Sequence, residues 1–177
     1  MNPDHGFPPL STPQARILIL GSMPSRQSLE QHQYYGNPHN AFWRIMSEYT
    51  DVAETCEYSV RVEGLHEAGI AVWDVIKQCV RPGSLDADID KDSIEVNDFA
   101  GFFDRHPEIQ AVFLNGGKAA YEYKRRVVPR LTQRHVVIPA VQLLSTSPAN
   151  ARYSLAQKKL NWSQIQSSLA PHIPREV

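Results

Sequence analysis

Residues 17–40, ILILGSMPSRQSLEQHQYYGNPHN, give the strongest indication of fold and function in this chain. The apolar run at 17–20 ends at Gly21 and opens into a loop of small residues, Ser22-Met23-Pro24-Ser25. A buried strand that ends in such a loop is where open α/β folds place ligands. The cluster at 34–40 then offers aromatic rings, amides and exposed backbone. These groups suit a nucleobase better than a metal or a lipid.

The composition is that of an ordinary globular protein. The chain has 177 residues, of which 42% are hydrophobic and 21% are charged. This length fits one domain with a full core, so we predict a single domain over 1–177. No apolar run approaches the ~20 residues of a membrane span. The first 14 residues are polar and rich in proline, which is unlike a signal or transit peptide. We expect a loose arm over 1–14 and a cytoplasmic protein.

Several metal and cofactor classes lack their sequence signatures. Cys56 and Cys79 are too few for an iron–sulfur cluster and form no CxxC pair, so we expect free thiols. The acidic run at 86–92 has Lys91 where a calcium loop needs glycine, and Asn97 where that loop needs glutamate. The seven histidines show no HExxH spacing, and no GxSxG motif occurs. The sequence therefore predicts no metal and no cofactor.

The net charge of −1 hides an uneven distribution along the chain. Residues 111–177 carry ten Lys and Arg against two acids, a local charge of +8 that leaves −9 on the first 110 residues. A basic half can give a polyanion a place to bind even when the whole chain is nearly neutral. Alternatively, these basic residues only keep the protein soluble and happen to be clustered.

Hydrophobic periodicity predicts alternating strands and helices. Short apolar runs bounded by turn residues predict strands at 16–20, 69–76, 109–114 and 135–144. Helical patterns occur at 25–33, 42–49, 58–68, 98–105, 118–128 and 152–169, and a long polar loop at 81–97. This alternation indicates an α/β fold, a three-layer αβα sandwich with a central four-stranded, mostly parallel sheet.

Three of the four predicted strands end in polar loops of small residues. These loops are GSMPS at 21–25, NGG at 115–117 and STSPAN at 145–150. In a parallel sheet, the loops that follow the strands all lie at one edge. The sequence therefore predicts that these distant segments meet in one site.

Each motif has a structural and a functional interpretation. GSMPS lacks the GxGxxG and GxxxxGK[ST] patterns of nucleotide phosphate loops, but its backbone could approach a planar ligand; a tight turn is the alternative. The 34–40 segment could be a turn over the core, or it could supply a stacking ring and an amide that positions water. Asn115 could cap a helix or read a base edge. The STSPAN hydroxyls suit a phosphate.

Together these motifs resemble the uracil-DNA glycosylase superfamily, most closely its hypoxanthine (deoxyinosine) DNA glycosylase branch. The resemblance runs in order over most of 16–152, and its most specific pieces are NPHNAFW at 37–43 and STSPA at 145–149. In several relatives an Asp or Asn that handles water stands where this chain has Met23. Many relatives also have His at the position of Asn150. Met23 puts efficient uracil release in doubt.

The resemblance implies a role for each candidate residue. Because Met23 cannot polarise water, the water-positioning amide would be Asn40, with Asn115 as the second catalytic residue. Residues that would bind the flipped base are Gly21, Ser22, Met23, Pro24, Tyr35 and Phe42. Residues that would bind the DNA backbone are Ser145, Ser147, Pro148, Asn150 and Arg152.

The resemblance also implies an activity and leaves alternatives open. It implies a monomeric DNA repair glycosylase that flips a deaminated base, foremost hypoxanthine, out of DNA and hydrolyses its N-glycosidic bond to leave an abasic site. No lysine lies within these motifs, which predicts hydrolysis without strand cleavage. The alternatives are a uracil-, xanthine- or mismatch-specific enzyme of the same superfamily, a lesion-binding protein without catalysis, and a metal-dependent nuclease.

Overall fold

The computed structural model describes residues 2–169 and is built around one parallel sheet. Its strands are β2 (Ile17–Gly21), β3 (Ile70–Asp74), β6 (Ala111–Asn115) and β7 (Ala140–Leu143), in the order β3-β2-β6-β7. All three pairings are parallel, and Ile17 lies opposite both Ile70 and Ala111. The predicted four-stranded sheet is therefore confirmed.

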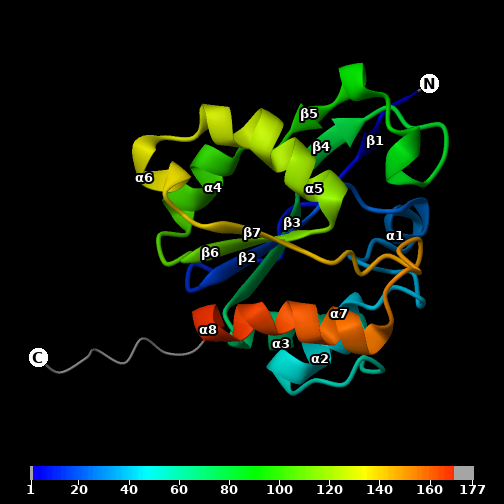
Figure 1. Cartoon of the computed structure of the whole chain (residues 1–177), viewed down its shortest axis with the longest axis vertical. Helices are drawn as coiled ribbons and strands as arrows, with labels where there is room; N and C mark the ends of the chain where they lie inside the picture. Colours follow the sequence, from blue (N-terminus) through cyan, green and yellow to red (C-terminus); the bar gives the residue numbers. More distant parts are fainter. Residues whose placement is uncertain (1, 170–177) are drawn as a thin grey trace, which may run out of the picture.

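Helices cover both faces of this sheet (Figure 1). One face carries α2 (Phe42–Thr50), α3 (Tyr58–Glu67), α7 (Leu155–Trp162) and the short α8 (Gln166–Leu169). The other carries α4 (Phe99–Arg105), α5 (Gly117–Glu122) and α6 (Gln133–Val136). Because both faces are covered, every residue of β2 is buried. The predicted αβα sandwich is confirmed.

Local signals explain where the helices nearest the sheet edge begin. The Ser25 side chain caps α1 (Arg26–Gln31) by accepting a hydrogen bond from the Ser28 amide. In α7, Ser154 and Gln157 form a capping box. The α2 stripe buries Phe42, Trp43, Ile45 and Met46 against the sheet, as its helical spacing predicts.

A second, antiparallel sheet corrects two expectations. It contains β1 (Asp4–His5), β4 (Ile76–Cys79) and β5 (Glu95–Val96), in the order β1-β4-β5. The N-terminal arm is thus not loose: β1 pairs with β4, and Leu10 forms a bridge with Val72. The strand predicted at 69–76 ends at Asp74, and the chain then turns into β4 of the other sheet. Asp74 therefore lies at the junction of the two sheets.

Other boundaries also differ from prediction. Residues 133–136 are the short helix α6, so only 140–143 of the predicted 135–144 strand joins the sheet. After α5 the chain continues as a short π-helix, η3 (Tyr123–Val127), and a 3₁₀ turn, η4 (Val128–Arg130). A 3₁₀ turn, η5 (Ser163–Ile165), separates α7 from α8. The polar loop contains the 3₁₀ turns η1 (Asp86–Asp88) and η2 (Lys91–Ser93). Among residues 2–169, no helix is long and apolar enough to cross a membrane.

The buried Arg81 side chain fastens the N-terminal arm to the loop after β2. Its guanidinium is only 1% exposed and donates hydrogen bonds to the Asp4 carboxylate at 2.9 and 3.2 Å. It also donates to the carbonyl oxygens of Pro24, at 2.9 Å, and Ser84, at 3.3 Å. One cation thus links the arm, the GSMPS loop and the polar loop.

We predict that Asp4→Ala destabilises the fold by about 3 kcal/mol or more, because it leaves a buried guanidinium without its carboxylate. Urea unfolding measures this change. The matched control is Glu95→Ala, which removes the exposed ion pair with Lys77 (2.8 Å) and should cost under about 1 kcal/mol. Equal losses in the two variants would contradict the role given to Arg81.

Candidate active site

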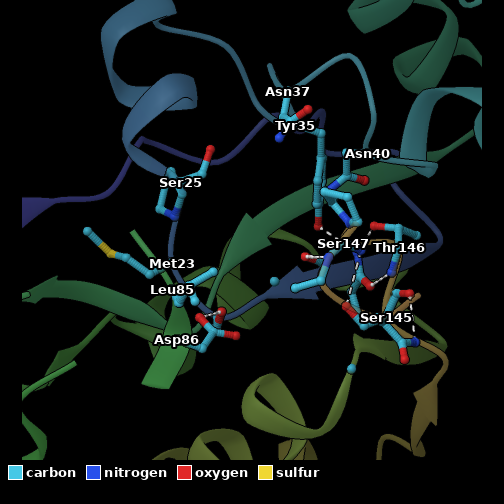
Figure 2. Close-up of a pocket in the computed structure, with 18 of the residues that line it drawn as sticks. Met23, Ser25, Tyr35, Asn37, Asn40, Leu85, Asp86, Ser145, Thr146 and Ser147 are labelled. Carbon is cyan, nitrogen blue, oxygen red and sulfur yellow. Dashed lines mark hydrogen bonds between the residues drawn. The ribbon is translucent and has the colours of Figure 1, made fainter. Parts of the chain in front are cut away.

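The loops after the parallel strands enclose a cavity of about 770 Å³ (Figure 2). Its lining residues come from the segments 21–25, 34–40, 84–87, 115–117 and 142–150, together with Ser28, Asp74 and Tyr153. The cavity opens where β2 and β6 lie side by side while their chain connections run in opposite directions across the sheet. Ligands of open α/β folds bind at this switch point. The three predicted loops therefore do converge on one site.

The Asn115 side chain joins three walls of the cavity. Its amide nitrogen donates to the Thr146 hydroxyl at 2.9 Å and to the Tyr35 hydroxyl at 3.1 Å. Its amide oxygen accepts from the Thr146 backbone N–H at 2.9 Å. Both amide hydrogens thus have protein partners. This arrangement favours a bracing role for Asn115 over direct reading of a base.

Tyr35 is held in an uncommon backbone conformation at the cavity wall. Its φ is 54°, in the left-handed region that non-glycine residues rarely occupy. Its ring stacks on Phe42, with centroids 3.9 Å apart and an interplanar angle of 18°. Burial and the nearby Asp74 carboxyl raise the pKa of Tyr35, so the phenol stays neutral. Phe42 has no exposed surface and lies behind Tyr35, outside the cavity lining.

Asn40 lines the cavity just before α2. Its Oδ1 accepts a hydrogen bond from the Phe42 backbone N–H at 3.0 Å, a local turn that fixes the side chain. Within the described part of the chain, its Nδ2 makes no hydrogen bond. An amide oxygen has two lone pairs, so Oδ1 could still accept from a water. The geometry is compatible with the predicted water-positioning role.

The GSMPS loop presents backbone donors rather than side chains. The N–H groups of Ser22 and Met23 donate to no acceptor within residues 2–169. The Met23 side chain packs with Ile76, Cys79 and Ile89, and in Figure 2 it extends away from Tyr35 and Asn40. Met23 thus contributes its backbone to the cavity, while its thioether belongs to a small apolar cluster.

Two carboxyl groups in the lining were not among the predicted site residues. Asp74, at the end of β3, is 4% exposed, and its Oδ2 has no hydrogen-bond partner within the described residues. Burial, with a smaller contribution from Asp86, raises the pKa of Asp74 to about 8. Asp86 accepts a hydrogen bond from the Ser22 hydroxyl at 2.6 Å. The residue as a whole is exposed, but loss of solvation at its carboxyl group raises its pKa too.

Side chains of helix α7 hydrogen-bond to the STSPAN loop and to the residue that precedes it. The Asn161 side chain accepts from the Leu144 N–H, and the Trp162 indole donates to the Leu144 carbonyl. The buried Lys158 donates to the Ser147 carbonyl at 3.2 Å, and burial lowers its pKa. These contacts fix the loop on a rigid helix.

The structure brings most of the predicted residues to the cavity wall, and the remaining ones lie close by. The lining includes Gly21, Ser22, Met23, Pro24, Tyr35, Asn40, Asn115, Ser145, Ser147, Pro148 and Asn150. Arg152 lies outside the lining; it is exposed, and its guanidinium lies 5.6 Å from the centre of the Tyr153 ring. Within residues 2–169, no group of three His, Cys, Asp or Glu side chains is placed to hold a metal ion.

Comparisons with known proteins show the family to which the chain belongs. A family model described as the Uracil DNA glycosylase superfamily matches residues 8–166. A protein of Methanosarcina barkeri named hypoxanthine DNA glycosylase is 38% identical over 161 residues, covering 90% of this chain and 95% of that protein. A protein of the same name from Methanosarcina acetivorans is 35% identical over 162 residues, covering 90% and 96%.

A solved structure shows the same fold. The solution NMR structure of a Methanosarcina acetivorans protein, whose title relates it to uracil DNA glycosylases, has a TM-score of 0.78 and 33% identity to this chain. The match covers 95% of this chain and 99% of that one. The fold, the cavity and these matches define the class as DNA glycosylases, enzymes that cleave the bond between base and sugar. The chain belongs to the uracil-DNA glycosylase superfamily, as its sequence motifs predict.

We predict that Asp74→Asn makes the protein more stable, and increasingly so as the pH rises. Between about pH 4 and pH 8 the folded chain keeps a proton on Asp74 that the unfolded chain releases, so stability falls with pH. The Asn variant lacks this loss. Urea unfolding should show a wild-type deficit that grows by about 1.4 kcal/mol for each pH unit between about pH 4 and pH 8. Parallel pH dependences in the two proteins would contradict the shifted pKa.

Proposed function

We propose that this enzyme removes hypoxanthine from deoxyinosine in DNA by hydrolysis. One observation carries the proposal. The cavity joins a rigid aromatic ring, an amide beside it and unused backbone N–H groups, a set of contacts suited to a flipped base. The two similar Methanosarcina proteins named hypoxanthine DNA glycosylase support the choice of base.

Each wall of the cavity would take one part of the substrate. The deoxyinosine would leave the base stack, at a cost of a few kcal/mol, and its base would lie beside the Tyr35 ring. The amides of Ser22 and Met23 would donate to the base as negative charge develops on it. Such a preorganised donor can lower the barrier by ~3 kcal/mol. Phe42 would act indirectly, by holding the Tyr35 ring from behind.

Asn40 would position the attacking water. An amide does not ionise in the accessible pH range, so it can orient a water but cannot act as a strong base. The sugar would pass through an oxocarbenium-like state, as in glycoside hydrolysis, and the water would add at C1′. Catalysis by Asn40 therefore rests on position.

The DNA backbone would lie across the STSPAN loop. Ser145, Ser147, Pro148 and Asn150 line that side of the cavity, and the exposed Arg152 lies beside it. Hydroxyl, amide and guanidinium groups are common phosphate partners. Because Lys158 supports this loop from a buried position, loop geometry and DNA affinity should depend on it.

We further propose a monofunctional enzyme that acts as a monomer on DNA in the cytoplasm. A strand-cleaving glycosylase would use an amine to form a Schiff base with the sugar. No lysine is among the lining residues in the described part of the chain. The product would be an intact strand with an abasic site.

The direct test uses a labelled duplex with one deoxyinosine, incubated under single-turnover conditions and then treated with alkali. The wild type should form alkali-labile sites in the presence of EDTA. Asn40→Ala should release the base at least about 100-fold more slowly. The control is Gln110→Ala, an exposed residue next to the far end of β6, which should keep the wild-type rate.

Matched duplexes and single strands carrying uracil or xanthine separate the other specificities, with deoxyinosine expected to react fastest. Binding of the lesion without base release would instead favour a binding protein. An Asn40→Ala variant as fast as the wild type would refute the water-positioning role.

A further inference from the structure

A buried carboxyl group lines the cavity, and one of its oxygens has no hydrogen-bond partner in the described part of the chain. Asp74 ends β3 at the junction of the two sheets, and its carboxyl lies against Gly21: a Cβ atom at Gly21 would come within 2.4 Å of Asp74 Oδ1. Oδ2 is inaccessible to solvent and has no hydrogen-bond partner within residues 2–169. A buried polar group normally has such a partner, so its absence at a ligand cavity calls for an explanation.

The groups around Asp74 favour a neutral carboxyl. Tyr34 and Tyr35 face it from the segment before α2, and burial together with Asp74 raises the pKa of both phenols. Asp86 faces it from η1 and adds negative charge. Arg81 is the nearby cation, but its guanidinium hydrogen bonds go to Asp4, Pro24 and Ser84. Arg81 therefore forms no ion pair with Asp74.

Three other residues of the cavity do not supply a proton to the departing base. Asn40 cannot give or take a proton, the Met23 side chain points elsewhere, and Asp86 already accepts a hydrogen bond from Ser22. A purine leaves sugar more readily as a neutral base than as an anion, so a proton donor inside the cavity would assist departure. The protonated oxygen of Asp74 would be such a donor.

We propose that Asp74 is a catalytic acid that gives its carboxyl proton to an acceptor atom of the departing base. This inference rests on the proposed hydrolysis of deoxyinosine. As the C1′–N9 bond breaks, its electron pair goes to the base and the Asp74 proton neutralises that base. Water adds hydroxide to C1′, and the proton that the water loses restores the carboxyl through solvent.

The pH dependence of single-turnover base release tests the proposal. Burial places the pKa of Asp74 at about 8, so the wild-type rate should fall tenfold per pH unit above that value. Asp74→Asn keeps a hydrogen-bond donor but has no proton to give. It should be about 100-fold slower at about pH 6.5, with no alkaline fall in rate. A purely structural role would lower the rate equally at every pH.

A second variant should change the pH at which the rate of base release begins to fall, while Asp74 itself is kept. Asp86→Asn still offers an oxygen to the Ser22 hydroxyl but removes the negative charge that helps to raise the pKa of Asp74. Its alkaline limb should therefore shift to lower pH. The proposal is overturned if Asp74→Asn releases the base as fast as the wild type. It is also overturned if the alkaline limb of Asp86→Asn lies at the same pH as in the wild type.

A direct titration separates this inference from the proposed function. The ¹³C shift of the Asp74 carboxyl, assigned by its absence in Asp74→Asn, should titrate near pH 8 in the free protein. Titration below about pH 5 overturns the acid role even if deoxyinosine is cleaved. Titration near pH 8 without base release from any lesion would instead overturn the proposed hydrolysis.

Discussion

The Asn115 side chain holds the site together, because three separate segments meet at it. β6 delivers it to the edge of the sheet, and its amide then fixes Tyr35 on one side and Thr146 on the other. Tyr35 needs this restraint because its left-handed backbone is strained for a residue with a Cβ atom. The Thr146 carbonyl in turn accepts from the Ala41 amide at the start of α2. The walls of the cavity are thus set by one another.

The covered parallel sheet also explains why the Asp74 carboxyl group stays protonated at neutral pH. Parallel strands with both faces covered bring β3 to its end in dry surroundings, where a carboxyl group loses its hydration. That position costs stability at neutral pH, as polar groups in active sites often do. In return the cavity gains an ionisable group that the amide Asn40 cannot replace. Asp74 and Asn40 would then divide the work, one acting on the base and the other on the water.

Residues with regular patterns were predictable, and those that depend on three-dimensional surroundings were not. The apolar runs at β2 and β6 and the small-residue loops after them predict the sheet and its ligand edge. The segment 133–136 is helical although His135–Val136 opens an apolar run, since a short run does not distinguish helix from strand. Asp74 was not predicted as a site residue because it lies inside the apolar run 69–76, which predicts a continuous strand. Its importance arises from burial, which only the packed sheets create.

The most direct test of this account maps where lesion DNA binds. Amide NMR shifts would be followed while ¹⁵N-labelled protein is titrated with a duplex holding an uncleavable 2′-fluoro analogue of deoxyinosine. We predict the largest shift changes at 22–25, 35–40, 115–117 and 145–150, and much smaller changes with an undamaged duplex. A second groove, lined by residues including Asn97, Phe99, Arg130 and Leu131, lies elsewhere on the surface. Lesion-specific changes centred there, with none at the cavity, would contradict it.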